Sequence, residues 1–132
     1  MTYGLDTSVV LRIITGEPAD LAEKVQSRLT AMIEAGDRIF ISCLAVSEAY
    51  YALQHFYGHT KENCIKALRA MSECNGFAFS DEAKAALSTP DAWKASPGLV
   101  DRMIAGEYAA LGHNTISCEK GFRKLDFTTV IS

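Results

Sequence analysis

The stretch Thr2-Tyr3-Gly4-Leu5-Asp6-Thr7-Ser8-Val9-Val10-Leu11 carries the first clue to the fold. Residues 2–6 predict a short buried strand that ends at Asp6. An ionised carboxylate at the end of a buried strand costs free energy of folding unless it is paired, solvated or bound to a metal. Three further acids lie at the starts or ends of later apolar segments, namely Glu48, Asp101 and Glu119. Four acids gathered at one edge of a sheet would form a site for a hard divalent cation.

Segments of strand length alternate with segments of helical spacing along the rest of the chain. Four further strands are predicted, at residues 38–42, 77–79, 114–117 and 127–131. Five helical segments are predicted, at residues 21–36, 43–56, 60–71, 81–87 and 99–111. Residues 89–98 contain two prolines and predict a loop. This alternation predicts an α/β fold with a mainly parallel sheet of about five strands and helices on both faces, a three-layer α/β/α arrangement.

Length and composition fit one folded domain spanning residues 1–132. The chain has 48% hydrophobic and 22% charged residues, which is ordinary for a globular domain. Its apolar stretches are too short for a membrane span. The first residues lack the basic and apolar regions of a secretory signal, so we expect a cytoplasmic protein.

Charge and cysteine content narrow the functional classes. A net charge of −3 argues against a protein that coats nucleic acid, but not against an enzyme that reaches a polyanion through a metal. The four cysteines form no Cys-x-x-Cys pair, and we interpret them as small buried hydrophobic residues rather than zinc ligands or disulfides.

The four acids are expected to converge because sites in parallel α/β sheets form at the carboxyl ends of strands. Asp6 ends the first strand, and Glu48 lies on the first turns after the second. Asp101 opens the helix after Pro97-Gly98, and Glu119 follows the fourth strand.

At this point the chain resembles the PIN-domain ribonucleases, and among them the small VapC-type toxins of toxin–antitoxin pairs. The resemblance runs over essentially the whole length, in the order and spacing of four motifs. These are Leu5-Asp6-Thr7-Ser8, Ser47-Glu48, Leu99-Val100-Asp101-Arg102-Met103-Ile104-Ala105, and Ser117-x-Glu119-x-x-Phe122-Arg123-Lys124-Leu125.

The resemblance implies roles for the matching residues. Asp6, Glu48 and Asp101 match metal-coordinating acids, and Glu119 stands where the family usually has Asp. Ser8 matches a small polar residue near the first acid, and Ser117 matches the hydroxyl residue two places before the fourth. Lys120 is not matched to the family: with Arg123 and Lys124 it forms a basic run that could be a solvated face or a surface that phosphates approach. Arg102 occupies a position where small residues are common in the family.

The same resemblance implies a function. We expect a Mg²⁺- or Mn²⁺-dependent endoribonuclease in which metal-activated water hydrolyses a phosphodiester. It also implies an RNA substrate, a cognate antitoxin protein and a homodimer. The alternative is a degenerate PIN domain that binds RNA or a partner protein without cutting, and Glu119 in place of Asp favours that alternative.

Simpler interpretations exist for each acid. Asp6 could cap the following helix, Asp101 could be a favourable first-turn acid, and Glu48 could lie on the wet edge of an amphipathic helix. His55 and His59 have a spacing that can bind zinc, but no third ligand is evident. A haloacid-dehalogenase-like phosphatase would need a second Asp where this chain has Ser8.

Overall fold

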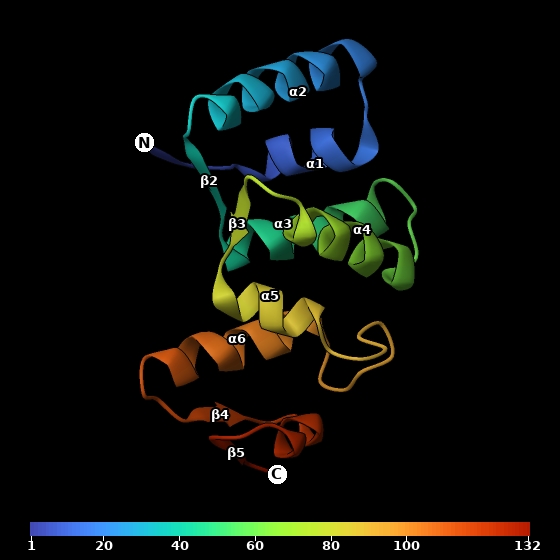
Figure 1. Ribbon diagram of the computed structural model, residues 1–132. Coiled ribbons are helices and arrows are strands. Elements are labelled where there is room, and N and C mark those ends of the chain that lie inside the picture. The colour runs from blue at the N-terminus through green and yellow to red at the C-terminus, as the bar shows by residue number, and fades with distance from the viewer. The chain divides into compact units, whose positions relative to one another are not determined.

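Strands and helices alternate along the chain, as the sequence predicts for an α/β fold. The computed structural model describes residues 1–132 (Figure 1). It consists of two compact units, Met1–Ser80 and Asp81–Ser132, and each is described separately.

The first unit contains a three-stranded parallel sheet. Its strands are β1 (Thr2–Gly4), β2 (Arg38–Ile41) and β3 (Phe77–Phe79), in the order β1-β2-β3. Tyr3 pairs with Ile39, and Ile39 pairs with Phe77. The expectation that the first strand is buried is wrong, since all three residues of β1 are exposed. The reason is its position, because β1 pairs with β2 alone and lies at the edge of its sheet.

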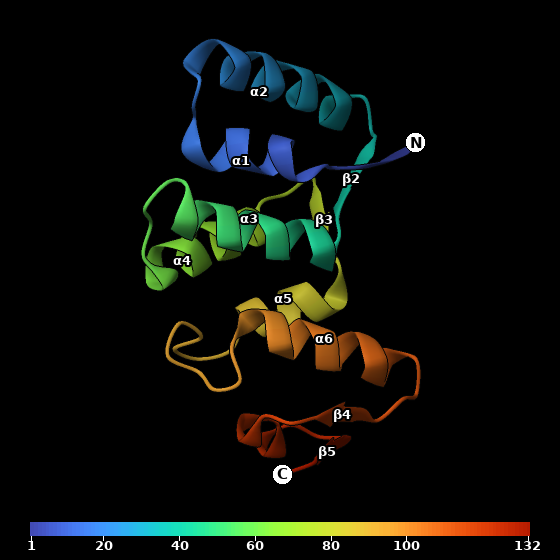
Figure 2. The ribbon, with the colours of Figure 1, turned by 180° about the vertical axis from the view of Figure 1, so that it is seen from behind.

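Four helices complete the first unit. They are α1 (Thr7–Thr15), α2 (Ala19–Glu34), α3 (Cys43–His55) and α4 (Lys61–Glu73). Helix α1 packs against both α2 and α3, and α3 packs against α4 (Figure 2). Three of these helices begin at a polar residue whose side chain accepts a backbone N–H of the first turn: Asp6, Ser42 and Thr60. Such caps satisfy donors that have no partner within the helix.

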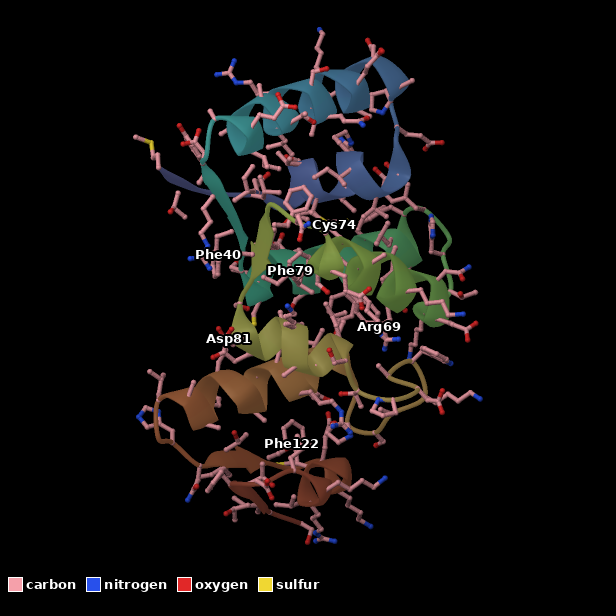
Figure 3. The ribbon with its side chains drawn as sticks, in the orientation of Figure 1. Phe40, Arg69, Cys74, Phe79, Asp81 and Phe122 are labelled. Atoms are coloured by element: carbon pink, nitrogen blue, oxygen red, sulfur yellow. The ribbon has the colours of Figure 1, made fainter.

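The core of the first unit lies on one face of β2. Ile39 and Ile41 are fully buried, whereas Arg38 and Phe40 alternate with them and are exposed. Figure 3 marks Phe40 on β2 and Phe79 on β3. The helices contribute further fully buried side chains, namely Val10, Val46, Leu53, Ile65 and Leu68. Burial of each such side chain stabilises the fold by about 1.5–3 kcal/mol.

The second unit contains two helices, a short 3₁₀ helix and a two-stranded parallel sheet. The elements are α5 (Asp81–Leu87), α6 (Leu99–Ala110), β4 (Thr115–Ser117), η1 (Lys120–Lys124) and β5 (Thr128–Val130). Helix α5 packs against α6, and β4 pairs with β5. Phe122 of η1 is buried, and Figure 3 shows it beside the β4–β5 strands. The hydroxyl of Thr128 donates to the carbonyl oxygen of Leu125 at 2.9 Å and ties η1 to β5.

The α/β prediction is confirmed, with all five strands present and all of them parallel to their neighbours. They form sheets of three and two strands, because β4 pairs with β5 and not with β1, β2 or β3. Helix α1 was not among the five predicted helical segments, and the 3₁₀ helix η1 was not predicted either. None of the helices combines the length and the apolar character needed to cross a bilayer.

The interpretation of the cysteines holds for two of the four. Cys43 and Cys64 are buried, and all four are free of disulfide bonds. The interpretation is wrong for Cys74 and Cys118, which are exposed. Cys74 follows the last residue of α4 and Cys118 follows the last residue of β4, and both therefore lie where the chain leaves a packed element.

Candidate functional site

Asp6 lies two residues beyond the end of β1 and caps helix α1. Its Oδ2 accepts the backbone N–H of Ser8 at 3.2 Å and the hydroxyl of Ser8 at 2.7 Å. Asp6 is exposed and its side chain is held by a neighbour only two positions away. The simple capping role is therefore real, and it also orients the carboxylate at the end of the strand.

Ser8 stabilises the ionised form of Asp6. Its hydroxyl, with a smaller contribution from its backbone N–H, lowers the pKa of Asp6 below the ordinary value of 3.8. Hydrogen bonds to the ionised form favour that form. Asp6 is ionised at neutral pH and exposed to solvent, and a carboxylate oxygen is the ligand type that Mg²⁺ prefers.

Glu48 lies on the second turn of α3, on the side of the helix that faces solvent. The opposite side carries buried residues, among them Val46, Ala49 and Leu53. Leu44 and Tyr51 flank Glu48 at helical spacing and are 70% and 49% exposed. Glu48 therefore lies on a solvent-exposed, partly apolar face of α3, and its carboxylate is accessible to a ligand.

Asp101 and Arg102 lie in the first turn of α6, and both are half-buried. The acid has the favourable position for a carboxylate at the start of a helix. Arg102 donates through Nε to the carbonyl oxygen of Pro97 at 2.8 Å, which ties α6 to the preceding loop. Arg102 also lines a cavity of about 440 Å³ in the second unit, whose other charged residues are Asp81, Glu82 and Asp126.

Ser117 and Glu119 lie where β4 leads into η1. The hydroxyl of Ser117 accepts the backbone N–H of Glu119 at 3.0 Å and shapes this turn. Glu119 is exposed and directly precedes η1, which brings three exposed cations close in sequence: Lys120, Arg123 and Lys124. The junction thus places one carboxylate next to a short basic segment.

The four acids divide equally between the two units. Asp6 and Glu48 belong to Met1–Ser80, and Asp101 and Glu119 belong to Asp81–Ser132. No group of three or more His, Cys, Asp or Glu side chains is positioned to hold a metal ion. The ion pairs Met1–Asp37 and Lys66–Glu62 involve none of the four acids. The carboxylate oxygens of the four acids and the hydroxyl oxygens of Ser8 and Ser117 suit a hard cation. A site shared by the four acids remains a prediction.

Parallel strands alternating with helices define this protein as an α/β domain, in which Asp6 and Glu119 follow the ends of β1 and β4. The model of the PIN domain family matches residues 3–128, so the chain belongs to the PIN domain family. The PIN domain is generally a nuclease fold, which supports a hydrolase in the broad sense. No curated protein and no solved structure matches the chain.

Sequence reasoning missed one polar contact that joins distant parts of the first unit. A terminal N–H of Arg12 in α1 donates to the hydroxyl of Tyr57 at 2.7 Å, across 45 positions of sequence. Neither residue lies in a recognisable motif. The only available signal was the position of Arg12 in the last turn of α1, where a cation is favourable.

Proposed function

We propose that this PIN domain is a Mg²⁺- or Mn²⁺-dependent endoribonuclease. The observation that carries the proposal is Asp6, an exposed and ionised carboxylate held by Ser8 directly after β1. In the proposed site Asp6, Glu48 and Asp101 coordinate the ion, and Glu119 acts through a water molecule. This requires the carboxylates of the two units to meet around one ion.

The protein's own groups would bind and orient the reactants. Ser8 holds the carboxylate of Asp6 in its ionised form, and Ser117 shapes the turn that carries Glu119. Lys120, together with Arg123 and Lys124 of the same 3₁₀ helix, attracts the phosphates of RNA. Arg102 stabilises the start of α6 through its hydrogen bond to Pro97. The bound ion supplies Lewis-acid polarisation of the phosphodiester and a water of lowered pKa. No nucleophilic side chain is required.

The proposal extends to the biological context that the VapC resemblance implies. We propose a cytoplasmic toxin of a type II toxin–antitoxin pair, inhibited by a cognate antitoxin and assembled as a homodimer. Exposed apolar residues on α3 and at its C-cap support assembly, since Leu44 is 70%, Tyr51 49% and Phe56 85% exposed.

The competing function is an RNA- or protein-binding PIN domain without catalysis. Glu119 in place of Asp favours it, because the longer side chain shifts the carboxylate by one C–C bond. A cleavage assay distinguishes the two functions. The nuclease cleaves RNA when the metal is present, whereas the binding domain does not cleave RNA with or without metal.

The test compares RNA cleavage by the wild type, Asp6→Asn and Asp20→Asn, each in Mg²⁺ and in EDTA. Asp20 is a matched control, because it is also an exposed acid at a helix start and accepts a backbone N–H, from Leu21 at 3.0 Å. We expect wild type and Asp20→Asn to cleave only with metal, and Asp6→Asn to lose at least about 100-fold in rate. Wild-type cleavage by Asp6→Asn in Mg²⁺ would contradict the proposal.

A further inference from the structure

Helices α1 and α2 enclose a cavity that the nuclease proposal does not use. The two helices lie side by side in both views of the ribbon (Figures 1 and 2). The cavity has a volume of about 340 Å³, within the range of small-molecule pockets. It lies entirely within the first unit, with Phe77 of β3 contributing to its lining.

The lining combines one cation with a largely apolar wall. The apolar residues are Ile13, Ala22, Leu29, Ile33 and Phe77. Gln26 and Thr30, one turn apart on α2, add an amide and a hydroxyl, and Arg12 is the one charged residue of the lining. A mainly apolar pocket with a few polar groups is the usual composition of a site for a small organic ligand.

Arg12 is incompletely satisfied by the protein. A terminal N–H of its guanidinium donates to Tyr57, but Nε is buried and has no hydrogen-bond partner. Neither of the ion pairs involves Arg12. The carbonyl end of α1 favours a cation at this position, yet that interaction supplies no acceptor to Nε. A buried donor without an acceptor is destabilising, and an anion would remove that cost.

The charge and shape of the site select the ligand. A carboxylate can accept from Nε–H and a terminal N–H of one guanidinium at the same time, in the two-bond geometry typical of arginine. A single negative charge neutralises Arg12 completely, whereas a phosphate dianion would leave a second charge against apolar side chains. The apolar wall then receives the hydrocarbon part of the ligand.

We propose that the cavity between α1 and α2 binds a small organic monocarboxylate, with its carboxylate on Arg12 and its apolar body against α2 and Phe77. Because Nε is shielded from solvent, the proposed binding requires the side chains around Arg12 to move and expose it. The proposal stands independently of the nuclease activity, since none of the cavity's residues belongs to the proposed metal site.

The test follows the Nε–H resonance of Arg12 by two-dimensional NMR of the full chain during titration with benzoate. Benzamide is the matched neutral probe, because it keeps the ring and loses the charge. We expect a saturable shift with benzoate at a Kd of about 1–10 mM, the range for a fragment of this size, and no saturable shift with benzamide. An absence of saturable shift up to about 50 mM benzoate, or equal binding of benzamide, would overturn the proposal.

Variants locate the site. Arg12→Met should abolish benzoate binding, and Arg28→Met should leave it unchanged, since Arg28 is an exposed arginine of α2 that does not line this cavity. Should Arg12→Met fail to fold, the wild-type Nε–H titration still decides the proposal. Loss of binding in Arg28→Met, or its retention in folded Arg12→Met, would assign the carboxylate to another place and refute the proposal.

Discussion

The pair Asp6 and Ser8 shows how much a single local contact can do. The hydroxyl of Ser8 donates to the carboxylate of Asp6 at 2.7 Å and lowers the pKa of the acid. The same carboxylate is helix cap and candidate ligand. A capping role and a metal role therefore do not exclude one another at this position.

Removal of the Ser8 hydroxyl should raise the pKa of Asp6 toward its ordinary value. In Ser8→Ala the principal cause of the lowered pKa is gone, whereas the backbone N–H of residue 8 remains as a weaker donor. The measurement is a ¹³C NMR titration of the Asp6 carboxyl in metal-free wild type and Ser8→Ala. An unchanged or lower pKa in the variant would show that the hydroxyl does not stabilise the ionised form.

The same contact has a predictable effect on stability. A carboxyl whose pKa is lowered by folding stabilises the protein above its unfolded-state pKa of about 3.9, and that contribution disappears as pH falls through the lower folded-state pKa. The Tm difference between wild type and Ser8→Ala should therefore be largest near neutral pH and shrink in acid.

Glu119 should respond differently from Asp6. It is exposed at a turn before η1, and we propose that it reaches the ion through water. Glu119→Asp should hold or raise the cleavage rate, whereas Glu119→Gln should lower it by about 10- to 100-fold, less than Asp6→Asn does. A Mg²⁺ titration of RNA cleavage compares the variants. An equally complete loss in Glu119→Gln and Asp6→Asn would make Glu119 a primary ligand, and no change in either Glu119 variant would make it a bystander.

At the scale of elements, the boundaries followed from residues that act locally. Asp6, Ser42 and Thr60 are strong caps, and each begins a helix in the structure. Strands followed from short apolar runs between turn residues. The 3₁₀ helix η1 escaped prediction, because five residues with three cations carry no helical periodicity.

Two glycines test the packing of α2 against the segment before β3. Gly36 and Gly76 have φ values of 90° and 98°, which L-residues rarely adopt. A Cβ on Gly76 would lie 2.7 Å from Cδ1 of Ile33, whereas a Cβ on Gly36 would meet nothing within 4 Å. Gly36→Ala therefore carries backbone strain alone, and Gly76→Ala carries strain and a clash.

We expect Gly36→Ala to lower the free energy of unfolding by about 1 kcal/mol, and Gly76→Ala by about 2–4 kcal/mol. Urea denaturation of both variants at neutral pH measures the difference. Equal destabilisation would show that Ile33 moves aside without cost. A smaller effect at Gly76 than at Gly36 would contradict the described packing of Ile33.

At the scale of the whole molecule, the sequence predicts the type of each strand better than its partners. Strand identity depends on a few neighbouring residues, whereas pairing depends on contacts between distant ones. The arrangement of β4 with β5 and of β1 at a sheet edge was accordingly not foreseen. The contact of Arg12 with Tyr57 has the same origin, since it arises from the packing of α1 on α3.

The candidate site shows the same limit. The acids were found because each follows a recognisable strand or opens a helix, and Ser8 because it lies two residues from Asp6. Their convergence stays a prediction, because it depends on how residues of both units come together and local pattern does not determine that. The family match over residues 3–128 spans both units and supports a common function for them.

The central claim is that acids from both units hold one divalent ion, and paramagnetic broadening by Mn²⁺ tests it most directly. We predict that NMR signals around Asp6 and Glu48 and around Asp101 and Glu119 broaden together at substoichiometric Mn²⁺. Excess Mg²⁺ should restore them, and Asp20→Asn should behave as the wild type. In Asp6→Asn the broadening should require far more Mn²⁺. Broadening confined to one unit, or identical broadening in Asp6→Asn and the wild type, would contradict a shared metal site.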